Sequence, residues 1–542
     1  MLMLTEIDSR PLSQVKILPL LLLVIPGALL GSAIVAYRLL LPIYSNGDYD
    51  YDPSYQYLLN GLSVIQGYVP GHIDHPGTPV QVLCGIVAAV LWLLARLTGG
   101  TTLDLNTAVV TDIELYLSGI AYFFAAMNAA AIGYVGWRVY RASGDLLIAI
   151  VCQAGFLLLG YLLPRLIYVS PEALMIFAAA MLMACLADVL FGRHVRTQRQ
   201  DLGVAVVSGF LLALGITSKA TFLPLILLLA ILPTRRDRVA GTLSFLTFMA
   251  VFLAPIYSKL SYVLHWYSNI ARHSGKYGQG PSEFIDFLLL PARLHALLDQ
   301  LPLIFVSSCA CILVLTLEII RSSKKGDILC RDVLTTCVLF LVFLSGLVLV
   351  LKHYEIYYII PSYVVSSIAF AWCLTRLFPD RGKWLHFSPR AIAAIFMIAL
   401  GAQQISTVLN DLSLQKRQRE ADLALLQNTL DANEDALVIG AYRSRTQTFG
   451  IAFALGYVDQ KFAALVSAGH QPYVQINRWN MKLFWPGVGW RPLSYVNELI
   501  TQGRNVLVVL PDDLNVPEIQ GPIVCHIPGA ERVIKVIKID EG

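Results

Sequence analysis

Long apolar blocks separated by short polar connections run through most of the sequence. They are roughly 15–27 residues long and carry few or no charges, which is the length needed to cross about 30 Å of hydrocarbon. The blocks occupy residues 17–43, 78–98, 113–137, 143–164, 169–192, 203–217, 219–233, 239–262, 301–320, 331–351, 357–376 and 391–410. The pattern predicts a mainly α-helical protein that crosses a membrane many times. The first block is far longer than a signal-peptide core, so we expect it to remain as a span.

Basic residues between the blocks set the predicted orientation, because loops rich in lysine and arginine stay on the cytoplasmic side. The clusters are Arg10/Lys16, Arg138/Arg141, Arg193/Arg196/Arg199, Arg235/Arg236/Arg238, Arg321/Lys324/Lys325/Arg331 and Arg376/Arg381/Lys383/Arg390. All of them face the cytoplasm only if one block between residues 44 and 112 does not cross. Block 78–98 contains Gln81 and Arg96, so we expect it to lie in the outer interface. The sequence thus predicts about eleven spans in a plasma (inner) membrane, with a cytoplasmic N-terminus and an extracytoplasmic C-terminus.

Composition agrees with this pattern and excludes several classes of function. Hydrophobic residues make up 56% of the chain and charged residues 14%, against about 25% charged residues in soluble domains. The net charge of +4 is small and spread out, so we expect membrane lipids around the protein and no nucleic-acid partner. The cysteines form no CxxC or CxxH pair, which argues against a metal knuckle or a disulfide framework.

The chain after the last apolar block is polar enough to form a small soluble domain. We therefore divide the protein into a transmembrane domain, residues 1–410, and an extracytoplasmic domain, residues 411–542. Short β-branched runs at 436–440, 505–510 and 533–539 alternate with helical patterns and predict an α/β fold. No glycine fingerprint follows the first run, so we expect no nucleotide site there.

Three aspartates with interleaved tyrosines follow the first span, in the run Asn-Gly-Asp-Tyr-Asp-Tyr-Asp that ends at Asp52. Carboxylates at a membrane edge without basic neighbours are costly to desolvate and indicate a function. Glycosyl transfer needs a carboxylate to take the proton of the acceptor hydroxyl, and Asp52 or Asp50 can supply it. Asp48, Asp50 and Asp52 can also hold a divalent cation, although the chemistry does not require a metal. The alternative is a solvated turn that caps the first span.

Two charged residues interrupt the apolar pattern on the predicted outer side. Glu172 follows Pro171 at the start of a span and is a second candidate acid; the alternative is an acidic residue that stabilises a helix's first turn. Lys219 lies between two apolar blocks, on the side opposite to the basic clusters. Because a lysine there goes against the orientation rule, a bound anion is a natural explanation, and snorkelling to lipid headgroups is the alternative.

Further cations lie in two later outer connections. The candidates for binding a phosphate are Arg272, His273 and Lys276 in the second outer loop and Lys352, His353 and Tyr354 before the tenth span. Trp266 or Tyr267 can stack on a sugar face. An aromatic belt with cations that bind lipid headgroups is the alternative explanation of this loop.

The first outer loop resembles that of the GT-C membrane glycosyltransferases, in particular the protein-mannosyltransferase and aminoarabinose-transferase branch. In that family the loop has an Asp-Glu pair, an amphipathic helix that ends in glycine, and a His-Pro-Pro motif before a helix that does not span. Here Asp52 takes the aspartate place, Gly67 takes the glycine place, and His75-Pro76 opens block 78–98.

Two positions of this loop depart from the family pattern. Pro53 replaces the glutamate of the pair and Gly77 replaces the second proline, so Asp50 stays an alternative to Asp52 as the base. The resemblance otherwise covers most of residues 1–410 as a pattern. It implies an acidic role for the position of Glu172, a phosphate contact for Lys219, and a place near the donor phosphate for the run that Lys352 opens.

The resemblance implies an inverting transfer of a hexosyl or pentosyl group from a polyprenyl-phosphate carrier. The acceptor, on the outer face, can be a glycan, a lipid or a protein, and no cofactor is required. A lipid-linked sugar transporter or flippase is an alternative, but such proteins often show repeat halves with polar residues near the midplane. A polysaccharide polymerase or ligase is another, and its lipid-diphosphate donor would call for a larger arginine cluster.

Overall fold

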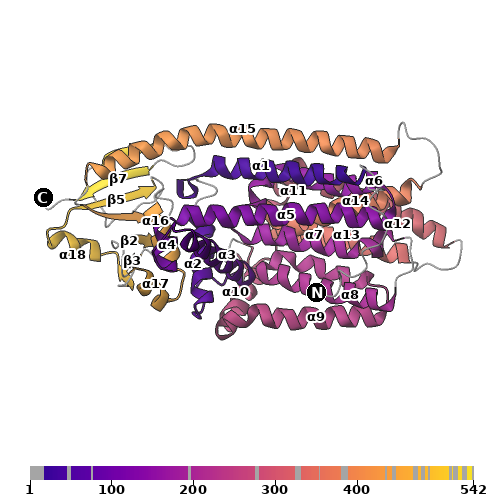
Figure 1. Ribbon diagram of the computed structural model, residues 1–542, viewed down its shortest axis with the longest axis horizontal. Helices are drawn as coiled ribbons and strands as arrows, with labels where there is room; N and C mark the ends of the chain where they lie inside the picture. The colour runs from indigo at the N-terminus through magenta and orange to yellow at the C-terminus, as the bar shows by residue number, and fades with distance from the viewer. Residues whose placement is uncertain are drawn as a thin grey trace.

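A computed structural model shows a long helical bundle with a small α/β domain at one end (Figure 1). The structure describes residues 18–45, 51–74, 77–192, 197–274, 280–323, 331–352, 354–379, 388–433, 436–441, 447–467, 474–477, 482–485, 489–511, 516, 523–527 and 534–539. Six of the predicted site positions lie outside these residues, namely Asp48, Asp50, His75, Pro76, Lys276 and His353.

Helices form the whole of the bundle. The α-helices are α1 (Val24–Leu40), α2 (Tyr51–Ile65), α3 (Thr78–Leu97), α4 (Leu105–Thr111), α5 (Ile113–Ser143), α6 (Leu146–Leu157), α7 (Pro171–Phe191), α8 (Gln198–Ser218), α9 (Arg235–Leu253), α10 (Leu260–Arg272), α11 (Leu290–Gln300), α12 (Pro302–Ser323), α13 (Arg331–Lys352), α14 (Ile360–Leu377) and α15 (Pro389–Asp431). Tighter 3₁₀ segments connect them at η2 (Leu18–Leu23), η3 (Ile43–Ser45), η4 (Gly160–Leu166), η5 (Ala220–Ile231), η6 (Ala254–Lys259) and η8 (Ile356–Ile359).

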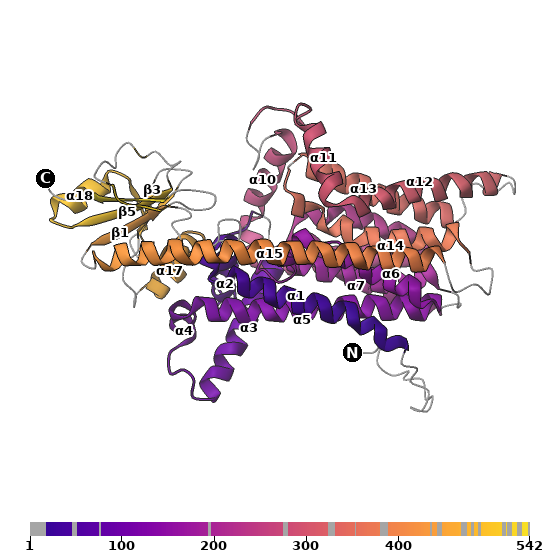
Figure 2. The ribbon, with the colours of Figure 1, turned by 90° about the horizontal axis from the view of Figure 1, so that it is seen from above.

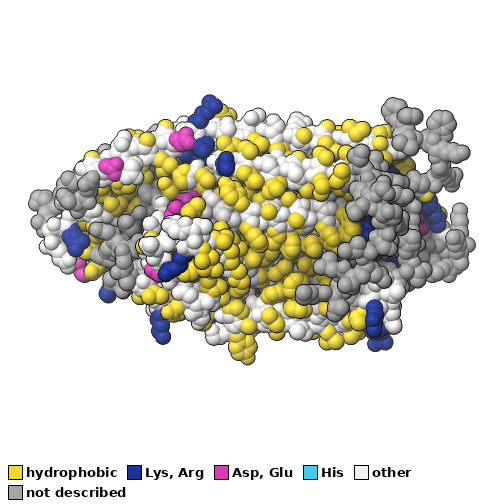
Figure 3. Space-filling model, viewed as in Figure 1, with side chains coloured by type: hydrophobic (Ala, Val, Ile, Leu, Met, Phe, Trp, Pro, Cys, Tyr) yellow, Lys and Arg dark blue, Asp and Glu magenta, His cyan; other side chains and the backbone are white. Residues whose placement is uncertain are grey.

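The apolar blocks of the sequence coincide with these helices. Among the described residues, ten helices are long and apolar enough to cross a membrane, and α6 and η5 are shorter apolar helices. The mainly α-helical, membrane-spanning fold predicted from the sequence is therefore confirmed. The most buried of these helices are α7 and α14, and apolar side chains cover much of the middle of the outer surface that Figure 3 shows. That surface has the composition that lipid chains require.

Block 78–98 forms α3, which is as long and apolar as the spans. Figure 2 shows α3 leaving the bundle across the direction of α5 and α15, whereas α10 and α11 project on the opposite side. That the block lies along the interface instead of crossing stays a prediction. Helices α2, α3 and α4 lie at the end of the bundle that carries the C-terminal domain (Figure 1).

Three glycines allow the close approach of α3 to its neighbours. A Cβ atom on Gly61 of α2 would lie 2.4 Å from a backbone oxygen of α3, and one on Gly85 of α3 would lie 2.4 Å from the Gly61 oxygen. Gly77, with φ of 66°, adopts the left-handed conformation before α3 begins. Its N–H donates to the Thr217 carbonyl at 2.9 Å, which fixes the start of α3 against α8.

Helix α15 joins the two domains without a break. It is 43 residues long, it contains the boundary predicted near residue 410, and it runs along the whole bundle (Figure 1). Lys416 and Arg419 donate to the carbonyls of Arg38 and Leu39, at 3.1 and 2.5 Å. These carbonyls lie at the C-terminal end of α1, where a helix leaves acceptors unsatisfied and favours positive charge.

The C-terminal domain is a seven-stranded sheet with helices beside it, as the sequence predicted for an α/β unit. Its elements are β1 (Leu437–Ala441), α16 (Gln447–Leu455), α17 (Gln460–Ser467), β2 (Val474–Asn477), β3 (Lys482–Trp485), β4 (Gly489–Pro492), α18 (Tyr495–Thr501), β5 (Val506–Pro511), β6 (Ile523–Ile527) and β7 (Ile534–Ile539). The strand order is β4-β3-β2-β1-β5-β7-β6. In the parallel centre, Ile439 lies opposite Val474 and Val508, and all three are buried.

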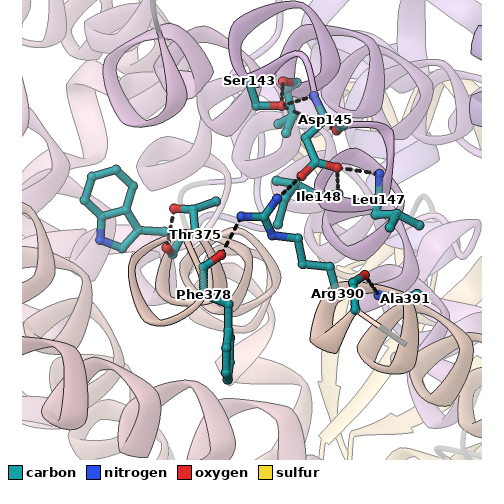
Figure 4. Close-up of polar contacts among 11 residues, drawn as sticks. Ser143, Asp145, Leu147, Ile148, Thr375, Phe378, Arg390 and Ala391 are labelled. Carbon is teal, nitrogen blue, oxygen red and sulfur yellow. Dashed lines mark hydrogen bonds and ion pairs between the residues drawn. The ribbon is translucent and has the colours of Figure 1, made fainter. Parts of the chain in front are cut away.

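A buried ion pair fastens the start of α15 at the end of the bundle away from this sheet (Figure 4). Arg390 Nη1 lies 2.5 Å from Asp145 Oδ2 at the start of α6, and Arg390 Nη2 donates to the Phe378 carbonyl at 2.7 Å. Asp145 also caps α6, because its Oδ1 accepts the N–H groups of Leu147 and Ile148. One guanidinium thus ties together α6, α14 and α15.

We expect Arg390→Met to lower the free energy of unfolding by up to about 3–5 kcal/mol, because it leaves the largely buried Asp145 carboxylate without this charge. The matched control is Arg321→Met, whose ion pair with Glu318 is exposed at the arginine and should contribute less than about 1 kcal/mol. Thermal unfolding of both variants in detergent micelles measures the difference. Equal losses would show that the Arg390 pair does not hold α15.

Candidate functional site

Asp52 lies at the beginning of α2, at the end of the bundle next to the C-terminal domain. Its backbone is extended, with φ of −97° and ψ of 116°, as expected for the residue before a proline. The regular helix therefore starts at Pro53, a residue suited to the first helical position. Tyr168 Oη donates to the Asp52 carbonyl oxygen at 3.5 Å. The half-buried Asp52 side chain is held at a helix start that packs against the segment before α7.

Tyr57, one turn further along α2, lies among the acidic residues of this region. Burial raises the pKa of the Tyr57 phenol well above its usual value, and the carboxylates of Glu172, Asp74 and Asp52 raise it further. The phenol therefore stays protonated at neutral pH and can donate a hydrogen bond but cannot act as the base. The carboxylates that act on Tyr57 come from three separate segments, namely α2, the loop before α3, and α7.

Glu172 and Lys219 form a buried ion pair. Lys219 Nζ lies 2.5 Å from Glu172 Oε1, and both residues are almost fully removed from solvent. Glu172 lies in the first turn of α7, and Lys219 follows the last residue of α8. The sequence predicted an acid and a phosphate-binding cation at these two positions. The structure brings the two together and makes each the partner of the other.

Tyrosine rings surround the two cations of this region. Lys219 Nζ lies 4.3 Å from the Tyr358 ring centroid and 5.0 Å from that of Tyr357. The Arg165 guanidinium lies 4.4 Å from the Tyr357 centroid and 5.5 Å from that of Tyr168. Such contacts stabilise a cation that has lost water. We call Asp52, Tyr57, Arg165, Tyr168, Glu172, Lys219, Tyr357 and Tyr358 the tyrosine-lined cluster.

Other predicted phosphate ligands have different contacts. Lys352 Nζ donates to the carbonyls of Phe284 and His273, at 2.8 and 3.3 Å, and lies 4.4 Å from the Phe284 ring centroid. Lys352 therefore fixes the second outer loop to the end of α13. Arg272 is exposed at the end of α10. The Tyr354 ring lies 5.7 Å from the Arg293 guanidinium. Phosphate binding by these residues and by His273 stays a prediction.

Three charged residues that sequence reasoning did not select lie at this end of the bundle. Arg165 contacts the tyrosine rings, and Asp74 acts on the Tyr57 phenol. Glu114, at the start of α5, accepts hydrogen bonds from Tyr55 Oη at 2.6 Å and from the Ile43 N–H at 3.1 Å. Arg165 could have been found from the sequence, because it ends an apolar block on the outer side and breaks the orientation rule as Lys219 does. For Glu114 the sequence gives no such signal.

A metal site finds no support in the residues that the structure describes. Nowhere among them do three His, Cys, Asp or Glu side chains come together in a way that could hold a metal ion. Asp48 and Asp50 lie outside those residues, so a divalent cation bound with Asp52 stays a prediction. The cations of the tyrosine-lined cluster, Arg165 and Lys219, can neutralise a phosphate without a metal.

A solved structure has the same architecture as the whole chain. The crystal structure of ArnT from Cupriavidus metallidurans bound to undecaprenyl phosphate is similar with a TM-score of 0.55, over 94% of this chain and 97% of that chain, at 12% sequence identity. The fold is ArnT-like. No family profile matches the sequence, and no curated protein matches it either.

The similarity to ArnT covers nearly all of both chains, so it extends over the bundle and the C-terminal domain together. It confirms the GT-C-like fold that the first outer loop indicated. At 12% identity, the likeness to ArnT is one of backbone architecture and assigns no role to any side chain.

Proposed function

We propose that the protein is a membrane glycosyltransferase that moves a sugar from a polyprenyl-phosphate carrier to an acceptor. The observation that carries the proposal is the tyrosine-lined cluster. Tyrosine rings contact the cations Arg165 and Lys219, and one of these tyrosines, Tyr168, donates a hydrogen bond to the backbone carbonyl of the half-buried Asp52. The ArnT-like fold supports it, since the solved ArnT structure contains undecaprenyl phosphate. Polyprenyl phosphate is therefore the class of carrier that we propose here.

The cluster supplies the two functions that this reaction needs. The acceptor hydroxyl oxygen forms a bond to the anomeric carbon while the bond from that carbon to the phosphate oxygen breaks. The hydroxyl proton passes to the Asp52 carboxylate. The leaving polyprenyl phosphate gains one negative charge, which Arg165 and Lys219 stabilise. Attack opposite to the leaving phosphate inverts the anomeric configuration.

We place this reaction on the extracytoplasmic side. Helices α5 and α7 run from the cluster to the opposite end of the bundle, where Arg138 of α5 pairs with Asp188 of α7. Further arginines lie at that end, namely Arg141, Arg199, Arg235, Arg236, Arg238, Arg321, Arg331, Arg376 and Arg390. Because arginine-rich ends stay in the cytoplasm, the cluster and the C-terminal domain would face outward.

The charges of the cluster suit a carrier with one phosphate. Lys219 is already paired with Glu172, and Arg165 is the second cation of the cluster. A lipid-diphosphate donor carries more negative charge and would need further cations. The cluster also lies at the ends of α7 and α8, not at the middle of the spans where transporters place their substrate sites. Both facts favour the glycosyltransferase over a polymerase or a flippase.

The test uses purified protein in lipid nanodiscs with radiolabelled polyprenyl-phosphate sugars. We expect labelled sugar to leave the carrier, free polyprenyl phosphate to accumulate, and Asp52→Asn to slow this release about 1,000-fold. Release from polyprenyl-diphosphate sugars alone would identify a polymerase or ligase instead. In proteoliposomes, movement of intact carrier across the membrane without cleavage would identify a flippase.

A further inference from the structure

The short loop at residues 70–74 is held by side chains of three elements of the bundle. Asn60 Oδ1 of α2 accepts the N–H groups of Gly71 at 2.8 Å and His72 at 3.3 Å. Gln81 Nε2 of α3 donates to the His72 carbonyl at 2.6 Å. Lys259 Nζ, at the end of η6, donates to the Pro70 carbonyl at 2.9 Å. The loop that carries Asp74 towards Tyr57 is therefore fixed from three directions.

A fourth support comes from the C-terminal domain. A Cβ atom on Gly71 would lie 2.3 Å from the Tyr457 carbonyl oxygen, so the two backbones are in direct contact. The rings of Tyr68 and Phe462 lie 5.7 Å apart, centroid to centroid. In α16, α17 and the turn between them, Phe449 packs with Leu507 and Val509 of β5, but most of the other buried side chains belong to the core of the bundle. They include Phe453, Ala454, Leu455, Val458, Phe462, Ala463 and Val466.

Aromatic rings continue this contact towards the tyrosine-lined cluster. The Tyr457 and His72 ring centroids lie 6.4 Å apart, edge to face, and those of His72 and Tyr57 lie 5.3 Å apart in the same geometry. The Tyr57 phenol in turn feels the charges of Asp52, Asp74 and Glu172, which raise its pKa. Three rings thus connect the C-terminal domain to the acidic side of the cluster.

We propose that Tyr457 is a positioning residue through which the C-terminal domain sets the place of the 70–74 loop, and with it of Tyr57 and Asp74. The part of this inference that concerns catalysis rests on the proposed function. Reacting groups must be held to within about 1 Å, and a displacement of that size can reduce a rate by about 100-fold. The C-terminal domain then helps to position the residues of the catalytic site.

The first test measures the loop and does not depend on the reaction. Hydrogen exchange of peptides that contain Gly71 and His72 is followed in the full-length protein in nanodiscs. We expect Tyr457→Ala to speed exchange at these amides about tenfold, since it removes one support of the loop. Tyr457→Phe keeps the ring and should leave exchange unchanged. The matched control is Tyr495→Ala, which removes a half-buried tyrosine that packs against the sheet core of the same domain.

A second variant disturbs the contact from the side of the loop. Gly71→Ala places a Cβ against the Tyr457 carbonyl and leaves every side chain of the C-terminal domain in place. It should speed exchange at His72 in the same way, even if Tyr457→Ala does not fold. Unchanged exchange in the folded variants overturns the proposal.

The second test measures turnover with a polyprenyl-phosphate sugar. We expect Tyr457→Ala to lower kcat about tenfold with little change in KM for the donor, Tyr457→Phe to restore kcat, and Tyr495→Ala to match the wild type. Faster exchange with an unchanged kcat overturns the link to catalysis. If the wild-type protein turns over no donor, the proposed function fails, whereas the exchange result still decides the place of Tyr457.

Discussion

Asp52→Asn should reduce the rate of sugar transfer about 1,000-fold while the protein still binds its carrier. A positioned base contributes about 10²–10⁴-fold to such a rate, and asparagine keeps the shape of the side chain but cannot take the proton. The carrier phosphate is bound by Arg165 and Lys219 in our proposal, so its affinity should change little. Single-turnover release of polyprenyl phosphate measures the rate, and equilibrium binding of unreactive polyprenyl phosphate measures the affinity.

Other aspartates at this end of the chain provide the controls. Asp104→Asn changes an exposed residue that caps α4 and should leave transfer at the wild-type rate. Asp50→Asn and Asp74→Asn test the two other carboxylates that the sequence or the structure places in this region. A loss confined to Asp50→Asn would move the base to Asp50, and wild-type activity of Asp52→Asn would end the assignment to Asp52.

Among substitutions in the tyrosine-lined cluster, Lys219→Met should lower the free energy of unfolding most. It should also reduce sugar transfer. Lys219 and Glu172 are both buried and lie 2.5 Å apart. Removing the ammonium group leaves the Glu172 carboxylate buried without its nearest cation, which lowers the free energy of unfolding by about 3–5 kcal/mol. Thermal unfolding in detergent measures this loss, and the release assay measures the activity.

A double variant separates the two roles of the pair. Lys219→Met combined with Glu172→Leu removes both charges, so most of the lost stability should return because an apolar pair often replaces a buried ion pair well. Transfer should not return, because the phosphate has lost a cation. The exposed Lys461 of α17 gives the control Lys461→Met, with neither effect. Recovery of activity in the double variant would show that Lys219 serves the fold alone.

The helical part of the fold could be predicted because each apolar block carries its own information. Length and charge decide whether a block such as that of α7 forms a helix, and no distant contact is needed. The three β-branched runs that form β1, β5 and β7 could likewise be recognised from their own residues, without knowledge of distant contacts. The 3₁₀ segments η4 and η5 were not foreseen, although each contains a proline, Pro164 and Pro224, which removes a helical hydrogen bond.

The candidate site was predicted less completely, because its geometry depends on contacts between distant segments. Glu172 and Lys219 were each selected for a separate role, and their pairing across 47 positions follows only from the packing of α7 against α8. Arg165 could have been selected from the sequence, because it is a basic residue at the predicted outer end of an apolar block. The contact of Tyr457 with Gly71 could not be predicted, since nothing in the composition of α16 and α17 distinguishes a surface that packs on a bundle from one that packs on a sheet.

The uninterrupted course of α15 has a consequence for the height of the C-terminal sheet above the membrane. At 1.5 Å per residue, 43 helical residues extend over about 65 Å, roughly twice the thickness of the hydrocarbon layer. The helix is held at its start by the contact of Arg390 with Asp145 and further along by the contact of Arg419 with the end of α1, so the sheet is kept at a fixed distance from the far end of the bundle. In the proposed function, an acceptor that reaches the site must fit the space that this fixed length leaves between the sheet and the lipid.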